Sequence, residues 1–89
     1  MKLYSCAWVL WVMTVVSYTP SLQVTYTPHD AFSSKEKCDE VLKDFAKAQK
    51  SWLDQMITNA LAAGGRVSSE FFRKNPIVCL PSPIDPRTS

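Results

Sequence analysis

The sequence predicts an α+β fold: a small antiparallel sheet of about three strands, in the order β-hairpin–helix–β, covered on one face by one long amphipathic helix. Three observations predict it. The beginning of the chain holds two segments that suit strands, joined by a polar connection with a proline. The middle has the apolar spacing of a helix, and a short apolar run between prolines follows near the end.

The first predicted strand covers residues 5–16, which read SCAWVLWVMTVV. Valine and tryptophan fit a pleated surface well. Apolar residues occupy both faces of this segment, which is typical of a strand that lies between two others. We therefore expect it at the centre of the sheet.

This stretch has a second interpretation, as a cleaved secretion signal. Lys2 would supply the short positive region, residues 3–16 the apolar segment, and residues 15–17 the cleavage site. The aromatic and valine content of the stretch favours the strand. As a helix it would be shorter than the ~20 residues needed to cross a bilayer, so we expect no membrane span.

A polar connection and a second strand follow. Residues 17–21, SYTPS, contain the proline that turns favour. In residues 22–26, apolar side chains alternate with polar ones, which is the period of a half-buried strand. The two strands therefore predict a β-hairpin.

The middle of the chain predicts one helix over residues 34–63. Ser33 and Glu36 have the spacing of a capping box, and Gly64-Gly65 would end the helix in a left-handed turn. We expect Val41, Phe45 and Trp52 to face the sheet. Apolar residues recur at the spacing of one helix face, namely at Cys38, Val41, Leu42, Phe45, Ala48, Trp52, Leu53, Met56, Ala60 and Leu61.

Such a helix would be ~45 Å long, which is long for so small a domain. Either its far end projects beyond the sheet and binds something, or the helix bends or breaks near Lys50-Ser51.

The last predicted strand covers residues 77–80 and lies between Pro76 and Pro81. Because proline cannot donate a hydrogen bond to a neighbouring strand, we expect this strand at an edge of the sheet. Residues 1–80 would then form a single domain, and the proline-rich residues 81–89 an extended tail.

Charge and composition argue against several classes of function. The chain of 89 residues carries a formal charge of +2 with both signs mixed, and its densest basic spot is Arg66 with Arg73-Lys74, beside Phe71 and Phe72. Three cations in a solvated loop do not predict nucleic-acid binding.

Catalytic and metal chemistry are not predicted either. A zinc site needs about four ligands, and His29 is the only histidine, so we expect no metal and no cofactor. His29-Asp30 has the residue types of a base with its orienting carboxylate, and Cys38 that of a nucleophile. The pair falls in an expected turn after Pro28, and no second base is present, so the sequence predicts a non-enzyme.

The cysteines leave alternatives open. Cys38 lies in the first turn of the predicted helix and Cys79 in the last strand, so a disulfide would form if these two elements pack together. The alternative is a pair of buried thiols, which a reducing cytosol would favour. Cys6 would be removed with a signal, or else remain as a buried thiol or a link between molecules.

Three blocks of the sequence resemble a group of small bacterial proteins of unknown function that are thought to be exported. The blocks are CAWVLW at residues 6–11, DAFSSKEKC at residues 30–38 and VCLPSPIDPR at residues 78–87. The resemblance implies a mature domain that contains the aromatic strand, and a pairing of Cys38 with Cys79. It implies no activity.

Two functional classes follow from this reading. The first is a small non-catalytic, disulfide-stabilised envelope or secreted interaction module, located in the periplasm or outside the cell. The second is a cytoplasmic accessory protein that covers surplus apolar surface by self-association. In either class the residues that we expect to contact a protein are Trp52, Leu53, Met56, Phe71 and Phe72.

Overall fold

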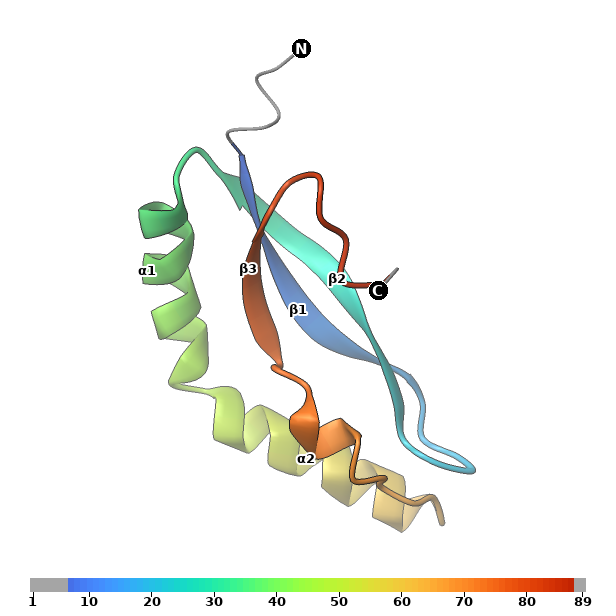
Figure 1. Cartoon of the computed structure of the whole chain (residues 1–89). Helices are drawn as coiled ribbons and strands as arrows, with labels where there is room; N and C mark the ends of the chain where they lie inside the picture. The colour runs from blue at the N-terminus through green and yellow to red at the C-terminus, as the bar shows by residue number, and fades with distance from the viewer. Residues whose placement is uncertain (1–6, 88–89) are drawn as a thin grey trace.

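The computed structural model describes residues 7–87, and within them a three-stranded antiparallel sheet and two helices form an α+β fold (Figure 1). The order across the sheet is β2-β1-β3, so the first strand is central and the last lies at an edge, as the sequence predicts. The elements are β1 (Trp8–Ser17), β2 (Gln23–Phe32), α1 (Lys35–Ala46), α2 (Gln49–Ala62), the 3₁₀ turn η2 (Phe71–Arg73) and β3 (Ile77–Pro81).

The expected single long helix is wrong, because the segment forms two helices in the part of the chain that the structure describes. Both ends lie close to the predicted positions, and Gly64, with φ of +84°, follows the end. The expected capping box of Ser33 with Glu36 is wrong, because the cap is Ser34, whose hydroxyl accepts from the Lys37 N–H. Between the two ends, the N–H groups of Lys47 and Ala48 donate to carbonyls only three residues back, and this tight turn ends α1. The break lies before the position expected for it at Lys50-Ser51.

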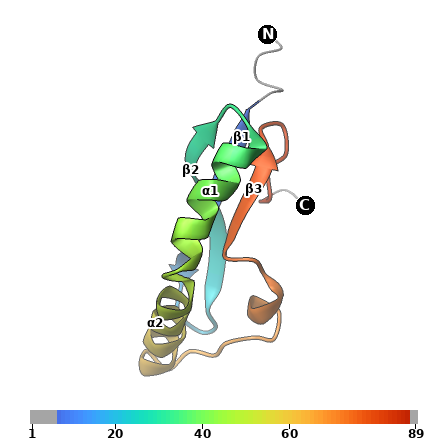
Figure 2. The ribbon, with the colours of Figure 1, turned by 90° about the vertical axis from the view of Figure 1, so that its left-hand side faces the viewer.

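The break lets each helix bury its own apolar side. Figure 1 shows α1 beside the sheet and α2 crossing below its lower end, and Figure 2 shows the two helices following one another along this side. One straight helix of ~45 Å could not lie beside the sheet and also cross below its lower end, so one of these two parts of the sheet would stay uncovered. The order β-β-α-α-η-β therefore replaces the expected β-hairpin–helix–β order among the described residues.

β2 extends further than the residues 22–26 that alternation predicted. It spans Gln23–Phe32 and includes Pro28. A proline is tolerated here because β2 lies at an edge of the sheet, where one side of the strand has no neighbour that needs a donor.

A bulge lies just beyond this proline. Trp11 pairs with Pro28 and Leu10 pairs with Asp30, which leaves His29 as the extra residue of β2. The expected turn at His29-Asp30 is therefore wrong, and both residues belong to the strand. Residues 5 and 6 of the expected first strand lie outside the described residues, and β1 begins at Trp8.

Two clusters of buried side chains form the core. Val41, Phe45 and Trp52 pack against the cluster that includes Leu10 of β1 and Ile77 of β3. The prediction that these three side chains face the sheet is therefore confirmed. The first cluster gathers Met13, Leu22, Met56, Ala60 and Phe71. The second gathers Leu10, Cys38 and Ile77.

The residues after β3 turn back instead of leading straight away. The Ser82 N–H donates to the carbonyl of Ala7, and the Ile84 N–H donates to that of Pro81, which itself belongs to β3. The Arg87 guanidinium then lies 4.9 Å from the centre of the Trp11 ring. Trp11 is 5% exposed, and Arg87 helps to cover it.

This contact predicts a small stability effect. Arg87→Ala removes a cation from a tryptophan face and also the exposed ion pair with Asp85, and we expect a small fall in the free energy of unfolding. Urea denaturation measures it. The matched control is Arg73→Ala, which removes an exposed arginine that makes no ring contact among residues 7–87. Equal stability of the two variants would show that neither the Trp11 contact nor the Asp85 ion pair of Arg87 contributes.

Candidate interaction site

The five expected contact residues lie on α2 and η2, and they differ in exposure. Met56 and Phe71, each 4% exposed, belong to the core. Trp52 and Leu53 are half-buried and pack against it. Phe72 is 65% exposed, so it is the member of the set most available to a partner.

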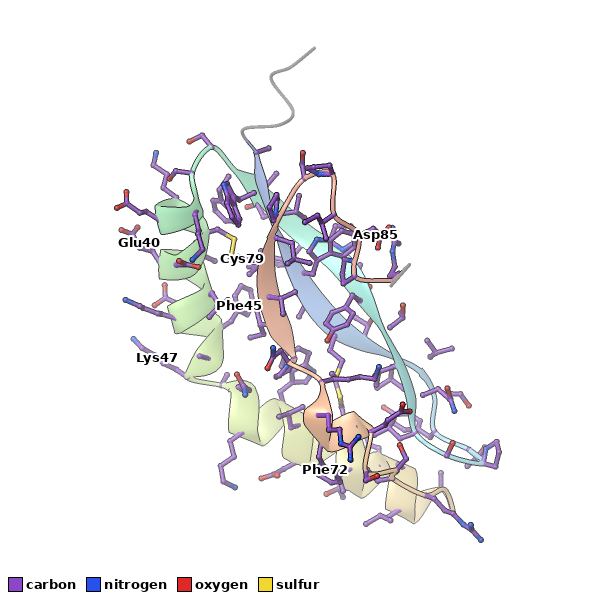
Figure 3. The ribbon with its side chains drawn as sticks, viewed as in Figure 1. Glu40, Phe45, Lys47, Phe72, Cys79 and Asp85 are labelled. Atoms are coloured by element: carbon purple, nitrogen blue, oxygen red, sulfur yellow. A yellow bond between two sulfur atoms is a disulfide. The ribbon has the colours of Figure 1, made fainter. Side chains whose placement is uncertain are left out.

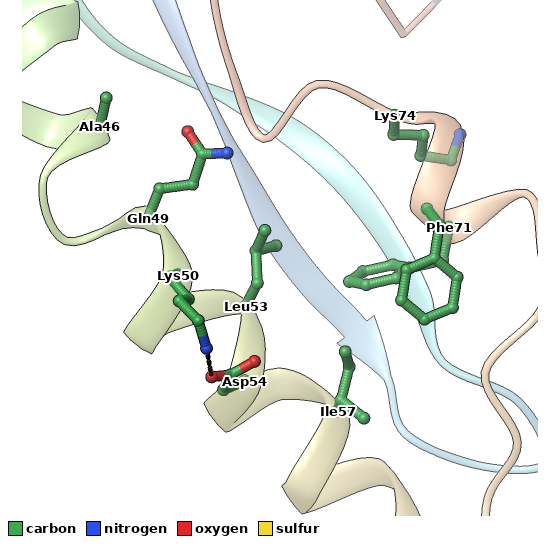
Figure 4. A pocket seen from close by; sticks show the side chains of 9 residues that line it. Ala46, Gln49, Lys50, Leu53, Asp54, Ile57, Phe71 and Lys74 are labelled. Carbon is green, nitrogen blue, oxygen red and sulfur yellow. Dashed lines mark hydrogen bonds and ion pairs between the residues drawn. The ribbon is translucent and has the colours of Figure 1, made fainter.

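α2 and η2 form the two walls of an open groove of about 450 Å³ (Figure 4). Leu53 and Ile57 project from α2 toward the phenylalanine rings of η2. The rings of Phe71 and Phe72 meet edge to face, with their centres 5.4 Å apart. The groove is lined by Ala46, Gln49, Lys50, Leu53, Asp54, Ile57, Phe71, Phe72 and Lys74.

The spacing of the helical wall follows from the geometry of α2. Its lining residues run from Gln49 to Ile57, and residues three or four apart among them share one side of the helix over about two turns, while Ala46 lies at the end of α1. The adjoining side of α2 carries Met56 and Ala60 into the core, and Leu53 and Ile57 pack partly against the same cluster. Leu53 and Ile57 therefore lie at the border between the buried and the exposed sides of α2 and stay half-buried.

Charged groups border the apolar part of the groove. Lys50 Nζ lies 3.0 Å from Asp54 Oδ2 on α2, as the dashed line in Figure 4 shows. On the η2 side, Arg73 and Lys74 make no ion pair with the residues that the structure describes. The η2 side is therefore the more positive one.

Backbone and side-chain hydrogen bonds hold η2 and its connection to β3 in place. The Tyr26 hydroxyl donates to the carbonyl of Asn75 at 2.7 Å, and the Met13 N–H donates to that of Pro76 at 2.8 Å. Phe71 anchors the turn because its ring is buried against Met13 and Met56. The second wall of the groove is thus attached to both long strands.

The Tyr26 anchor predicts a pH effect. Burial raises the pKa of Tyr26 above its usual value of 10.0. Because the folded state favours the neutral phenol, this contribution to stability is complete below pH ~10 and is lost as the pH rises through the raised pKa. Urea denaturation between neutral pH and pH ~11 should show the loss. Tyr26→Phe should lack the part of the stability loss that comes from ionisation of Tyr26. If the stability of this variant falls with pH as steeply as that of the unmodified chain, Tyr26 is not the cause.

Cys38 and Cys79 form a disulfide between the first turn of α1 and β3 (Figure 3). Their Cα atoms are 6.2 Å apart, within the usual range for bridged cysteines. Cys38 is completely buried. The bridge lies in the second core cluster, away from the groove, so its role in the fold is structural. Cys6 lies outside the described residues.

The candidate catalytic groups His29, Asp30 and Cys38 have separate partners and do not converge on one site. The His29 ring packs edge to face on Phe45, with the ring centres 4.9 Å apart, and Asp30 accepts from the N–H of Ala31. Cys38 is bonded to Cys79 and so offers no thiol. Within residues 7–87, no three histidine, cysteine or acidic side chains lie close enough together to hold a metal ion.

Sequence reasoning missed Ile57 and Gln49 as groove residues. For Ile57, the missed signal is its spacing of four residues from Leu53, which extends the same apolar row. Leu61, four residues further, is 59% exposed and continues that row beyond the groove. Phe71 and Phe72 could be singled out by type, but their approach to α2 depends on the path of residues 63–70.

Fold and groove together define a small disulfide-linked α+β domain with an open apolar surface. Compared with known proteins, the chain matches no family model, no curated protein and no solved structure. The resemblance to exported bacterial proteins therefore stays a prediction. None of the helices in residues 7–87 combines the length and the apolar character that crossing a membrane requires.

Proposed function

We propose that the protein is a small non-catalytic, disulfide-stabilised interaction module that binds a protein partner through the groove between α2 and η2. One observation carries the proposal: Leu53, Ile57 and Phe72 meet in an open groove, and Phe72 is 65% exposed. Aromatic and aliphatic side chains exposed together on rigid elements are typical of protein contact surfaces.

The shape of the groove favours a polypeptide over a small ligand. Its helical wall extends over about two turns of α2 and is open to solvent along that length. Small-molecule sites enclose most of the surface of their ligand. A helix or an extended segment of a partner would instead lie along α2 and bury Phe72 beneath it.

The disulfide supports a location in the periplasm or outside the cell. Disulfides persist in oxidising compartments and are rare in the cytosol. Cell fractionation with thiol labelling tests this part of the proposal. We expect the protein in the extracytoplasmic fraction with Cys38 and Cys79 blocked to thiol reagents. Free thiols at both positions in a cytosolic fraction would overturn it.

Site-specific photo-crosslinking tests the contact surface. A photoreactive residue in place of Phe72, in cells that naturally make the protein, should yield a crosslinked species of discrete mass. The matched control is the same residue in place of Val16, which is also 65% exposed but lies on β1. Crosslinking of equal yield from both positions, or from neither, would contradict the proposed surface.

A second candidate function is that of a cytoplasmic accessory protein that associates with itself. The observation that favours it is the exposure of Leu61 and Phe72, two large apolar side chains on α2 and η2. Free cysteines in the cytosolic fraction, together with a crosslink of Phe72 to a second copy of the chain, would support it in place of the exported module.

A further inference from the structure

Trp11 carries a buried hydrogen-bond donor that no group within residues 7–87 accepts. Its indole N–H is closed off from solvent and has no acceptor within hydrogen-bond distance in this part of the chain. The residue as a whole is 5% exposed. Buried polar groups are nearly always paired, because an unpaired donor loses its hydrogen bonds to water without a replacement. The closed surroundings of Trp11 therefore cost free energy, and contact with water would remove this cost.

Trp11 lies on the face of the sheet that α1 does not cover. In the ladder between β1 and β3, Leu10 pairs with Cys79, and the disulfide of Cys79 joins this face to α1. Trp11 pairs with Val78, one position further along. Successive side chains of a strand point to opposite faces, so Trp11 and Val78 point away from α1. The chain after β3 turns back toward β2 (Figure 1) and covers Trp11 on this face.

Residues 82–87, which we call the strap, are attached to the sheet at their beginning. The Ser82 N–H donates to the carbonyl of Ala7 at 2.9 Å, and the Ile84 N–H closes a turn by donating to Pro81 at 2.9 Å. Two further prolines follow within the strap, and each restricts rotation of the backbone. The part beyond the turn is therefore stiff and can move as one unit.

The far end of the strap rests on Trp11 and buries little surface of its own. The Arg87 guanidinium lies 4.9 Å from the centre of the Trp11 ring. Asp85 orients it, because the carboxylate accepts from Arg87 Nη2 at 2.7 Å and from Nε at 2.9 Å. Ile84 is 49% exposed, and the side chain of Arg87 is 47% exposed. The apolar surface that holds the strap closed is therefore small.

We propose that the strap is a conformational cover, which opens about the turn at residues 81–84 while the sheet stays folded and so exposes the indole of Trp11. Closing gains the cation–π contact with Arg87 but leaves the indole N–H unpaired. Opening gives this N–H to water or to an acceptor oxygen of a bound molecule. Because the two effects oppose each other and are similar in size, the open state costs little. The cover is separate from the groove between α2 and η2, so it does not rest on the proposed function.

Hydrogen exchange of the oxidised full chain, followed by NMR, tests the opening. The protection factor of the Trp11 indole N–H should be at least about tenfold lower than that of the Met13 backbone N–H. Met13 is a suitable reference, since its N–H donates to Pro76 at 2.8 Å beside the β1–β3 ladder. Trp11→Phe identifies the indole signal. A smaller difference would overturn the proposal, because Trp11 would then be exposed only when the sheet unfolds.

Low concentrations of urea separate opening of the strap from unfolding of the sheet. Opening exposes few residues, so exchange of the Trp11 indole N–H should change little as urea is added. Exchange of the Met13 N–H should accelerate steeply, because unfolding exposes the whole core. If both groups depend on urea to the same degree, the strap does not open by itself and the proposal is wrong.

Arg87→Ala tests whether the strap controls the exposure of Trp11. Loss of the ring contact should raise the exchange rate of the indole N–H about two- to fivefold. The matched control is Arg73→Ala, which removes an exposed arginine of η2 and should leave this rate unchanged. The backbone NMR spectrum first checks that both variants fold. Equal exchange rates of the Trp11 indole in the two variants would contradict the proposed cover.

Discussion

Cys79→Ala is expected to lower the free energy of unfolding by about 2–5 kcal/mol. The bridge joins residues 41 apart in the sequence, and a closed loop of this length corresponds to about 4 kcal/mol in the chain-entropy model. A domain of 89 residues has a total stability of about 5–15 kcal/mol, so this is a large share of it. Urea denaturation of the variant and the unmodified chain measures the difference.

The loss should begin at one edge of the sheet. Cys79 pairs with Leu10 of β1 in the ladder, and its bridge to Cys38 ties β3 to the start of α1. Without the bridge, the short edge strand keeps only one neighbour, so the amide hydrogens of β3 should exchange first.

Reductant supplies the second measurement of the bridge. It should lower the melting temperature of the unmodified chain and have no further effect on Cys79→Ala. Cys6→Ala serves as the control, because it leaves Cys38 and Cys79 in place and should respond to reductant like the unmodified chain. A melting temperature of the unmodified chain that is indifferent to reductant would rule out the bridge as a source of stability.

The features that were predicted well rest on local chemistry. A serine caps the start of α1, although it is Ser34 and not the expected Ser33, and Gly64 supplies the left-handed residue after α2. The prolines that flank the last strand lack the N–H that a central strand needs, so its edge position could be inferred before any neighbour was known. In each case the residue and the feature lie within a few positions of each other.

The length of the expected helix left a break near Lys50-Ser51 open, but its position at Lys47-Ala48 could not be predicted, since its cause is not local. Lys47 and Ala48 are good helix formers, and no glycine or proline interrupts the apolar spacing there. Phe45 packs against the second core cluster, whereas Met56 is part of the first. A single straight helix could not place both side chains in these clusters, so the chain turns between them. Long-range packing overrides helix propensity at this point.

The extension of β2 was hidden for a related reason. Pro28 normally argues against a strand, and it is accepted here only because β2 has a neighbour on one side. Which strand lies at an edge depends on how β3 returns to β1 from the far end of the chain. Alternation of side chains within residues 22–26 carries no information about that return.

The candidate site was predicted by residue type but not by position. Aromatic and aliphatic side chains on α2 and near residue 71 could be named, yet type alone does not separate Phe71, which is buried, from Phe72, which is exposed. The path of the chain between α2 and η2 decides which ring turns inward. The same path depends on two glycines at the end of α2.

Gly65→Ala is expected to lower the free energy of unfolding by about 2–4 kcal/mol, in the upper range for overpacking. A Cβ at position 65 would overlap the backbone carbonyl oxygen of Tyr18 and lie 3.2 Å from the carbonyl oxygen of Ala60. Both obstacles are backbone atoms, so no side chain can turn aside to make room. The chain itself has to move.

Such a movement would break the hydrogen bonds that join the end of α2 to the hairpin loop. The Gly65 N–H donates to Ala60 at 2.8 Å, the Arg66 N–H to Pro20 at 3.0 Å, and the Leu22 N–H to Arg66 at 2.7 Å. These bonds lie beside the buried side chain of Leu22, so a shift here also disturbs the first core cluster. Local strain would therefore become a loss of packing.

The neighbouring glycine provides the matched control. Gly64 has φ of +84°, which disfavours alanine, but an added Cβ there meets no atom within 4 Å. Gly64→Ala should therefore lower the free energy of unfolding by only about 1–2 kcal/mol, the cost of the left-handed conformation. Urea denaturation of both variants compares them directly. If Gly64→Ala is the more destabilised of the two, the backbone conformation at Gly64 matters more for stability than the close approach of Gly65 to Tyr18. The hairpin loop would then pack less tightly against the end of α2 than the hydrogen bonds require.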